Sequence, residues 1–163
     1  MGVGGERPGM RRVMAQGTFD ILHPGHRHYL EESAALGDEL VVVIARDSRV
    51  ATRKDVFLDE ESRQRVVEGM DAVDRAVLGS EADLFASVAE IEPDVITLGH
   101  DQDYEIDALE ADLAVAGFEG IDVVRIDAYD GPGVTSSSDV KARILARYGD
   151  EAFESTAKSE RRR

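Results

Sequence analysis

Two histidines lie three residues apart near the start of the chain, in the run His23-Pro24-Gly25-His26. Residues three apart share one face of a helix, so both imidazoles are expected to project together. Proline suits the first turn of a helix, and glycine lets the backbone approach a ligand closely. The free N–H groups at a helix start favour anions, and imidazoles beside them can donate hydrogen bonds to phosphate oxygens. The pattern indicates a phosphate site; the alternative is an ordinary turn with two solvated histidines.

The residues before the histidines favour the phosphate site. The short apolar run 13–15 predicts a strand that ends near Gln16, and the sequence GTFD at 17–20 follows it directly. The resulting order is a strand, a tight turn and a helix start. A turn of this kind brings backbone N–H groups close to a bound phosphate.

Apolar runs and amphipathic stretches alternate along the rest of the chain. The run 39–46, ELVVVIAR, is typical of a strand buried on both faces of a parallel sheet. Strands that alternate with helices predict right-handed crossovers. We therefore expect an α/β fold, a Rossmann-like doubly wound parallel sheet of about five strands with flanking helices. The expected strands are 13–16, 39–46, 75–78, 94–98 and 123–126, and the expected helices are 24–36, 59–70, 80–93, 105–116 and 138–148.

Local signals mark the ends of several of these helices. Asp59 is expected to cap the second helix, and Ser80 with Asp83 resembles a capping box for the third. Gly37 and Gly117 are expected to end the first and fourth helices.

The length of 163 residues suits one domain. We expect a disordered segment over 1–11, a folded domain over 12–148 and a polar, fraying tail over 149–163. The first residues are basic and lack the apolar stretch of a secretory signal.

The composition is strongly acidic, with 34 acidic against 19 basic residues and a net charge of −15 at pH 7. Such a surface repels nucleic acid and anionic membranes, and no apolar run is long enough to span a bilayer, so neither is an expected partner. The absence of cysteine excludes disulfides, thiolate metal sites and a cysteine nucleophile. The acid excess favours a salt-adapted (halophilic) cytoplasmic protein over an ordinary acidic one. Lysine is scarce, occurring only as Lys54, Lys141 and Lys158.

A second polar turn, GHDQ at 99–102, follows the expected strand 94–98. In open parallel sheets ligands bind beyond the carboxyl ends of the strands, at a switch point, so this turn and GTFD are expected to meet there. The sequence contains neither a G-x-G-x-x-G nor a Walker A pattern, which argues against a dinucleotide-binding dehydrogenase and a P-loop NTPase.

The GTFD turn followed by HPGH resembles the signature of the H-x-G-H nucleotidylyltransferases, a group that includes the cytidylyltransferases. Within that group the chain is most similar to the archaeal FAD synthases, which are FMN adenylyltransferases, from about Arg12 to Arg147. The resemblance implies a nucleotidyltransferase domain over 12–148 that transfers AMP from ATP to FMN, by direct in-line attack of the FMN phosphate on the α-phosphate. It also implies ATP and FMN as partners, a divalent ion such as Mg²⁺ carried with ATP rather than held by a metal site of the chain, and, by analogy with related enzymes, a homodimer.

The resemblance also assigns roles to individual residues. His23, His26 and Lys54 would act in catalysis, the histidines by holding the phosphates. Arg53, Lys54 and Arg63 would bind the substrate; the alternatives are a solvated loop cation for Lys54 and a surface ion pair for Arg63. Two roles stay open for Asp20, which would orient its turn or hydrate the metal ion. Nucleotide contacts are expected from Thr18, Phe19, His23, Pro24, Gly25, His26, Asp101, Tyr129, Ser136 and Ser137.

The sequence is also compatible with two other functions. One is a CTP-dependent transferase acting on glycerol 3-phosphate or a similar small phosphate. Cytidylyltransferases carry Arg-Thr-Glu-Gly-Ile before the equivalent serines, whereas this chain has YDGPG at 129–133 and lacks that arginine. The other is a non-catalytic nucleotide-binding or flavin-carrier protein, against which both histidines and Lys54 argue. The chain also departs from the archaeal family in lacking cysteines near its C-terminus.

Overall fold

The computed structural model describes residues 8–50 and 56–160. The strands are β1 (Arg12–Gly17), β2 (Glu39–Ile44), β3 (Arg75–Leu78), β4 (Val95–Leu98) and β5 (Asp122–Arg125). The helices are α1 (Pro24–Ala34), α2 (Asp47–Val50), α3 (Glu60–Glu68), α4 (Leu84–Ile91), α5 (Ile106–Val115) and α6 (Ser137–Glu160).

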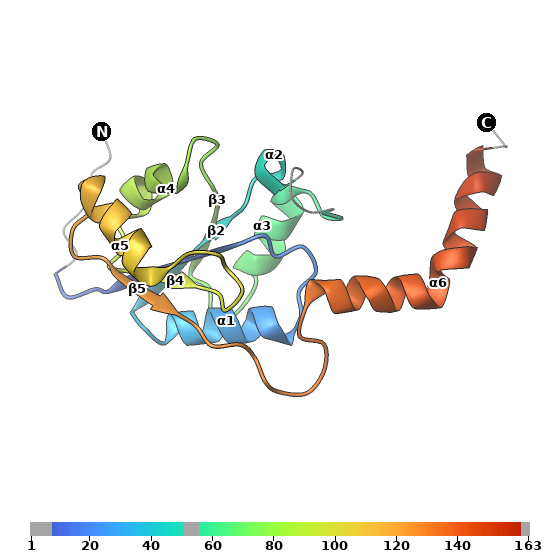
Figure 1. Cartoon of the computed structure of the whole chain (residues 1–163), viewed down its shortest axis with the longest axis horizontal. Helices are drawn as coiled ribbons and strands as arrows, with labels where there is room; N and C mark the ends of the chain where they lie inside the picture. Colours follow the sequence, from blue (N-terminus) through green and yellow to red (C-terminus); the bar gives the residue numbers. More distant parts are fainter. Residues whose placement is uncertain (1–7, 51–55, 161–163) are drawn as a thin grey trace.

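The strands form one parallel sheet in the order β3-β2-β1-β4-β5 (Figure 1). The chain winds outward from β1 to β3, returns to place β4 beside β1, and continues outward to β5. The direction of winding therefore reverses between β1 and β4, which is where such sheets bind their ligands. The expected doubly wound parallel sheet with flanking helices is confirmed.

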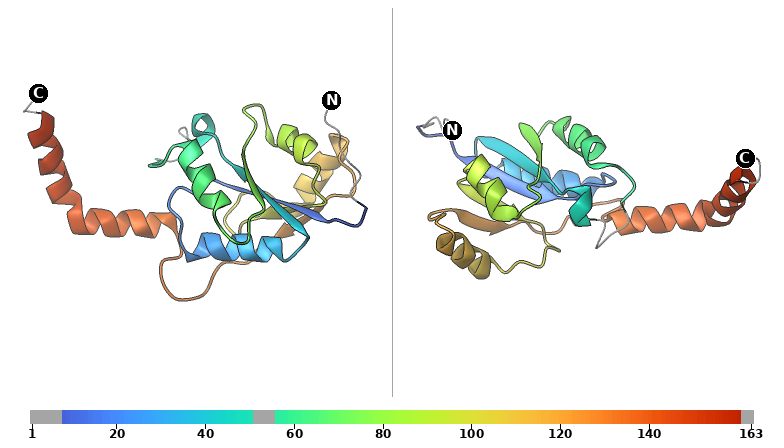
Figure 2. Two further views of the ribbon diagram at one scale, coloured as in Figure 1. Left: turned by 180° about the vertical axis from the view of Figure 1, so that it is seen from behind. Right: turned by 90° about the horizontal axis from the view of Figure 1, so that it is seen from above.

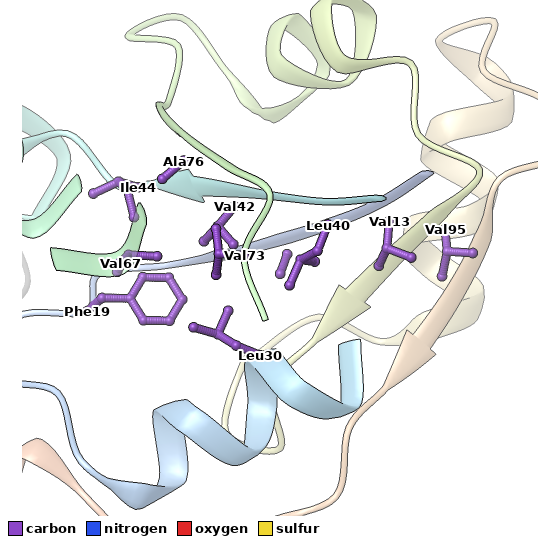
Figure 3. Packing of buried hydrophobic residues seen from close by; sticks show 11 residues of the cluster. Val13, Phe19, Leu30, Leu40, Val42, Ile44, Val67, Val73, Ala76 and Val95 are labelled. Carbon is purple, nitrogen blue, oxygen red and sulfur yellow. The ribbon is translucent and has the colours of Figure 1, made fainter. Parts of the chain in front are cut away.

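Two apolar clusters cover the two faces of the sheet. Successive residues of a strand point to opposite faces, so Val13 and Ala15 of β1 join one cluster while Met14 joins the other. The first cluster lies under α1 and α3, as Figure 3 shows for Leu30 and Val67. The second lies under α4 and α5. Each fully buried aliphatic side chain contributes roughly 1.5–3 kcal/mol, so the run ELVVVI of β2, buried from Leu40 onward, anchors both layers.

Most predicted boundaries lie within two residues of the observed ones, and Asp59 caps α3 as expected, its side chain accepting a hydrogen bond from the Ser62 amide. Two predicted caps were wrong. The N-cap of α4 is Asp83, which accepts from the Ala86 amide, whereas Ser80 lies outside the helix. The helix α1 ends at Ala34, before Gly37, and a Cβ at Gly37 would lie 2.5 Å from the Arg11 carbonyl oxygen. Gly37 is therefore required by close backbone packing.

The final helix was predicted to end at Tyr148, but α6 continues to Glu160. Figures 1 and 2 show α6 extending away from the sheet and its covering helices, with a change of direction part-way along. Gly149 and the polar residues after it suggested a helix end, but residues of these types can also continue a helix.

Among residues 8–50 and 56–160, no helix has both the length and the apolar character needed to cross a membrane.

The ion pairs of the described residues engage only part of the acidic surface. Arg12 pairs with Glu39 at 2.5 Å and Arg46 with Glu60 at 3.0 Å, both partly buried, and Arg27 pairs with Glu31 at an exposed site. Even if every basic residue paired with one acidic residue, the net charge of −15 would remain. Mutual repulsion of these carboxylates opposes the compact state.

We expect the thermal midpoint to rise by several degrees between about 0.1 M and about 1 M KCl, because the Debye length falls from about 10 Å to about 3 Å. Circular dichroism melting at fixed pH measures the shift. Chloride is the suitable anion, because sulfate stabilises proteins generally. A midpoint that does not change with salt would contradict salt adaptation.

Candidate active site

The turns after β1 and β4 meet the first turns of α1 and α6 beyond the carboxyl ends of the neighbouring strands β1 and β4. The Ser137 hydroxyl of α6 donates to the Ile21 carbonyl, before α1, at 3.4 Å. A Cβ on Gly25 of α1 would lie 2.9 Å from the Thr135 carbonyl oxygen, before α6. Two helix N-termini are therefore adjacent, and each offers free N–H groups and the positive end of a helix dipole. This is a favourable place for an anion.

His23 is the N-cap of α1, with an extended backbone, and its Nδ1 accepts a hydrogen bond from the Gly25 amide at 3.1 Å. A neutral imidazole that accepts at Nδ1 carries its proton on Nε2, so Nε2–H is the donor available to a ligand. A Cβ on Gly25 would lie 2.9 Å from the His23 ring. Glycine is therefore needed for this cap.

The two imidazoles are brought together as predicted. The ring centroids of His23 and His26 lie 3.8 Å apart with 28° between the planes. The ring of Phe19 lies 5.3 Å from His26 on the core side. Burial lowers the pKa of His23 from its ordinary 6.5, while the carboxylates of Asp101 and Asp139 act in the opposite direction.

The GTF turn has an unusual backbone that explains its residues. Phe19 has a φ of +54°, a left-handed conformation that is costly for a bulky side chain. Its ring is buried in the core cluster and covers Gly17, where a Cβ would lie 2.8 Å from the ring. The side chain of Phe19 therefore fixes the turn, and only its backbone remains for the predicted nucleotide contact.

The contacts of Asp20 support the first of its two expected roles, the orientation of its turn. Its buried carboxylate accepts from the amides of Phe57 and Leu58 at 2.9–3.1 Å. The Lys141 ammonium of α6 lies 3.6 Å from the same carboxylate and 5.0 Å from the centre of the Phe57 ring. Asp20 thus orients its turn by joining it to the segment before α3 and to α6.

Arg63 of α3 is fully buried, with its donors directed at protein groups. The guanidinium donates to the carbonyls of Leu58 at 3.0 Å, Thr18 at 2.7 Å and Ala45 at 2.8 Å, and to the Asp47 carboxylate at 2.6 Å. Instead of a surface ion pair, the structure shows a charge inside the protein that holds the GTFD turn. This burial corrects the expected direct contact with substrate, because the donors are engaged by carbonyls and Asp47, and gives Arg63 a positioning role.

The GHDQ turn is held by side-chain bonds. Gln102 accepts from the Gly99 amide at 3.1 Å and donates to the Gln16 carbonyl at 3.2 Å. Arg125 of β5 donates to the carbonyls of Gly99 at 2.8 Å and Gln102 at 3.0 Å, and also to that of Tyr104. This places the exposed Asp101 close enough to His23 to influence its pKa.

The remaining predicted residues are placed as follows. Ser136 caps α6 by accepting from the Asp139 amide at 3.1 Å. Tyr129 donates to the Pro132 carbonyl at 3.0 Å and its ring lies 5.8 Å from that of His28. Pro24 occupies the first turn of α1. Arg53 and Lys54 lie outside the described residues.

Sequence reasoning missed several residues that shape this region. Lys141 was available as one of only three lysines. Gln102 stood within the GHDQ turn without an assigned role. Tyr29 and Arg125 had no signal beyond their positions in a helix and a strand, because their partners come from other elements.

Comparison with known proteins agrees with this geometry. The model of the family described as cytidylyltransferase-like matches residues 14–143. The chain belongs to the cytidylyltransferase-like family. Among its curated relatives is the FAD synthase of Methanolacinia petrolearia, 48% identical over 138 residues, which cover 85% of this chain and 93% of the relative. The FAD synthase of Natrialba magadii is 48% identical over 135 residues, covering 83% and 88%.

Two solved structures have a fold similar to that of this chain. The crystal structure of the lipopolysaccharide core biosynthesis protein from Thermoplasma volcanium GSS1 has a TM-score of 0.72 and 50% identity, covering 75% of this chain and 100% of that one. A protein with unknown function from Archaeoglobus fulgidus has a TM-score of 0.60 at 16% identity, covering 76% and 96%. The second likeness concerns the fold alone.

We expect Arg63→Lys to lower the free energy of unfolding by about 2–4 kcal/mol, because a lysine cannot serve three carbonyls and each unsatisfied buried acceptor costs about 1–3 kcal/mol. Urea unfolding measures the change. Arg65→Lys is the matched control, an exposed arginine on the same helix, for which the change should stay within about 0.5 kcal/mol. Equal effects of the two substitutions would contradict the positioning role.

The lowered pKa of His23 gives a second prediction. The imidazole should titrate below pH 6.5 in the folded protein, whereas the unfolded chain takes up the proton near 6.5. Since the unfolded state then binds more protons, the free energy of unfolding should fall as pH drops through 6.5. NMR titration of the His23 ring, assigned by its loss in His23→Gln, measures the midpoint. A midpoint above 6.5 would mean that the neighbouring carboxylates outweigh burial.

Proposed function

We propose that the protein transfers the AMP group of ATP to FMN and releases pyrophosphate, forming FAD. The observation that carries the proposal is the stacked pair of imidazoles beside two adjacent helix N-termini, at the switch point of the sheet. The FAD synthase relatives, which align over most of the chain, support FMN as the acceptor.

The reaction needs charge stabilisation more than covalent help. An oxygen of the FMN phosphate attacks the α-phosphorus of ATP, and the bond from that phosphorus to the bridging oxygen breaks, so that pyrophosphate leaves. Negative charge on the transferring group and on the leaving oxygens is the main barrier. The Nε2–H of His23, the His26 imidazole and the N–H groups of α1 and α6 are suited to stabilise it. No enzyme nucleophile is required.

A divalent ion such as Mg²⁺ neutralises the triphosphate when bound. Mg²⁺ keeps several waters and is usually held by one or two carboxylates together with substrate phosphates. No group of three potential ligands gathers among the described residues. Exposed Asp101, near His23, fits the role of one supporting carboxylate, so the ion would arrive with ATP.

The remaining predicted residues would bind the two substrates. Asp101 and the backbone of Thr18 and Phe19 would bind the nucleotide, with Ser136 and Ser137 at the triphosphate. Tyr129 would stack on the base or the flavin after its ring leaves His28. Arg53 and Lys54 would contact the acceptor, and two copies of the chain would form a dimer in the cytoplasm.

A CTP-dependent reaction is less well supported. The loop before Ser136 carries no arginine, and Tyr129 closes this loop on itself through the Pro132 carbonyl. Curated relatives that align over most of the chain are named FAD synthase.

The test is pyrophosphate release in high salt with Mg²⁺, pairing ATP or CTP with FMN or glycerol 3-phosphate, and with FAD measured by chromatography. Release only with ATP and FMN is expected. Release only with CTP would replace the proposal by a cytidylyltransferase, and no release from folded protein would favour a non-catalytic role.

In the same assay, His26→Gln should lower kcat by about 10²-fold, the scale of losing one donor to a developing charge. His100→Gln is the control, because His100 is an exposed histidine. Near-normal turnover of the His26 variant in folded protein would remove the histidine from the mechanism.

A further inference from the structure

The sheet is unevenly paired around its first strand. The strand β1 pairs with β2 along its whole length, from Arg12 to Gly17. It pairs with β4 only at Val13 and Met14. If the register of Met14 with Ile96 continued, the Gln16 amide would donate to the Thr97 carbonyl and the Gly99 amide to the Gln16 carbonyl. Neither bond is made directly.

The Tyr29 hydroxyl occupies the first of these two positions. Tyr29 comes from α1, and its hydroxyl accepts from the Gln16 amide at 3.3 Å and donates to the Thr97 carbonyl at 2.9 Å. One direct bond between the strands is thus replaced by two bonds in series through an oxygen atom.

The Gln102 carboxamide occupies the second position in the same way. Its Nε2 donates to the Gln16 carbonyl at 3.2 Å and its Oε1 accepts from the Gly99 amide at 3.1 Å. Both backbone groups of Gln16 and their two partners on the β4 side are therefore satisfied, as buried backbone requires. The strands are separated at no cost in unpaired groups.

We propose that Tyr29 and Gln102 are spacers that hold β1 and β4 apart at their carboxyl ends and so set the width of the crevice that receives the nucleotide. The proposal rests on the proposed function for the identity of the ligand. The turns on either side of the crevice begin directly after the separated residues, GTFD after Gln16 and GHDQ after Leu98. A change in strand separation would therefore move both turns.

Both spacers are held from outside the gap. The Tyr29 ring lies 6.4 Å from the Phe19 ring, with 19° between the planes. The Gln102 backbone is held by Arg125, which also holds Gly99. These supports come from the GTFD turn and from β5, so neither spacer depends on a bound ligand for its position.

The test uses Tyr29→Phe and Gln102→Met in the full-length protein, because each keeps the bulk of the side chain and removes its bridging atoms. Crystal structures of both variants and steady-state kinetics with ATP and FMN are the measurements. We expect the Gln16 amide to approach Thr97, or Gly99 to approach the Gln16 carbonyl, within direct hydrogen-bonding distance. The value of kcat/KM for ATP should fall about tenfold or more, since misplacement by about 1 Å can cost 10²-fold.

Two matched controls separate positioning from general loss of stability. Ser87→Ala removes a buried hydroxyl of α4 that accepts from the Ser80 amide at 3.2 Å, beyond the edge strand β3. Gln64→Met removes a carboxamide that donates to the Ala76 carbonyl of β3 at 2.9 Å. Both should lower the unfolding midpoint yet keep kcat/KM for ATP within about twofold of wild type, by the usual independence of distant sites.

Unchanged strand separation with near-wild-type kcat/KM in the spacer variants would overturn the proposal, and so would equal losses in the controls. If the wild-type protein forms no FAD from ATP and FMN, the proposed function fails instead. The crystal structures then decide the spacers alone: strands that close support them, and strands that stay apart refute them.

Discussion

The separation of β1 from β4 is the constraint on which the rest of the site depends. A doubly wound parallel sheet has one place where the chain leaves a strand in opposite directions, and here it lies between these two strands. The loops on the two sides lead away from each other, and sheets of this kind bind their ligands in the crevice between such loops. The bridging hydroxyl of Tyr29 and carboxamide of Gln102 keep the crevice open while satisfying the backbone.

One wall of this crevice is built on buried charge. Arg63 binds three carbonyls from the GTFD turn, the end of β2 and the segment before α3. Asp20 binds two amides of that same segment and lies near Lys141 of α6. Because a charge inside a protein is stable only when its partners are fixed, these two residues couple the turn, α3 and α6. The histidine pair is presented from this framework, and its own position depends on Gly25.

The arrangement suits a reaction in which the protein supplies position and charge. The donors gather at the start of α1. They are two helix N-termini, the neutral His23 with its proton on Nε2, and the second imidazole stacked on it. A preorganised set of donors loses little by reorganising during the reaction. The acidic surface outside the crevice makes this cluster of donors a local exception in a chain of net charge −15.

The fold class, the parallel strands and the pairing of His23 with His26 could be predicted from the sequence, because these follow from apolar periodicity and from spacing along one segment. It also gave the Asp59 cap, which is local. It did not give the N-cap of α4, the packing role of Gly37 or the length of α6, where several local patterns compete.

The roles of Arg63, Tyr29, Gln102 and Arg125 became visible only in the folded chain. Their partners are backbone groups of other elements, and a backbone carbonyl carries no mark in the sequence. Arg63 was expected to bind the substrate because its position matches an arginine of the related enzymes; folding instead placed four acceptors around it. Local spacing reveals which residues share a face, whereas the fold alone determines what that face meets.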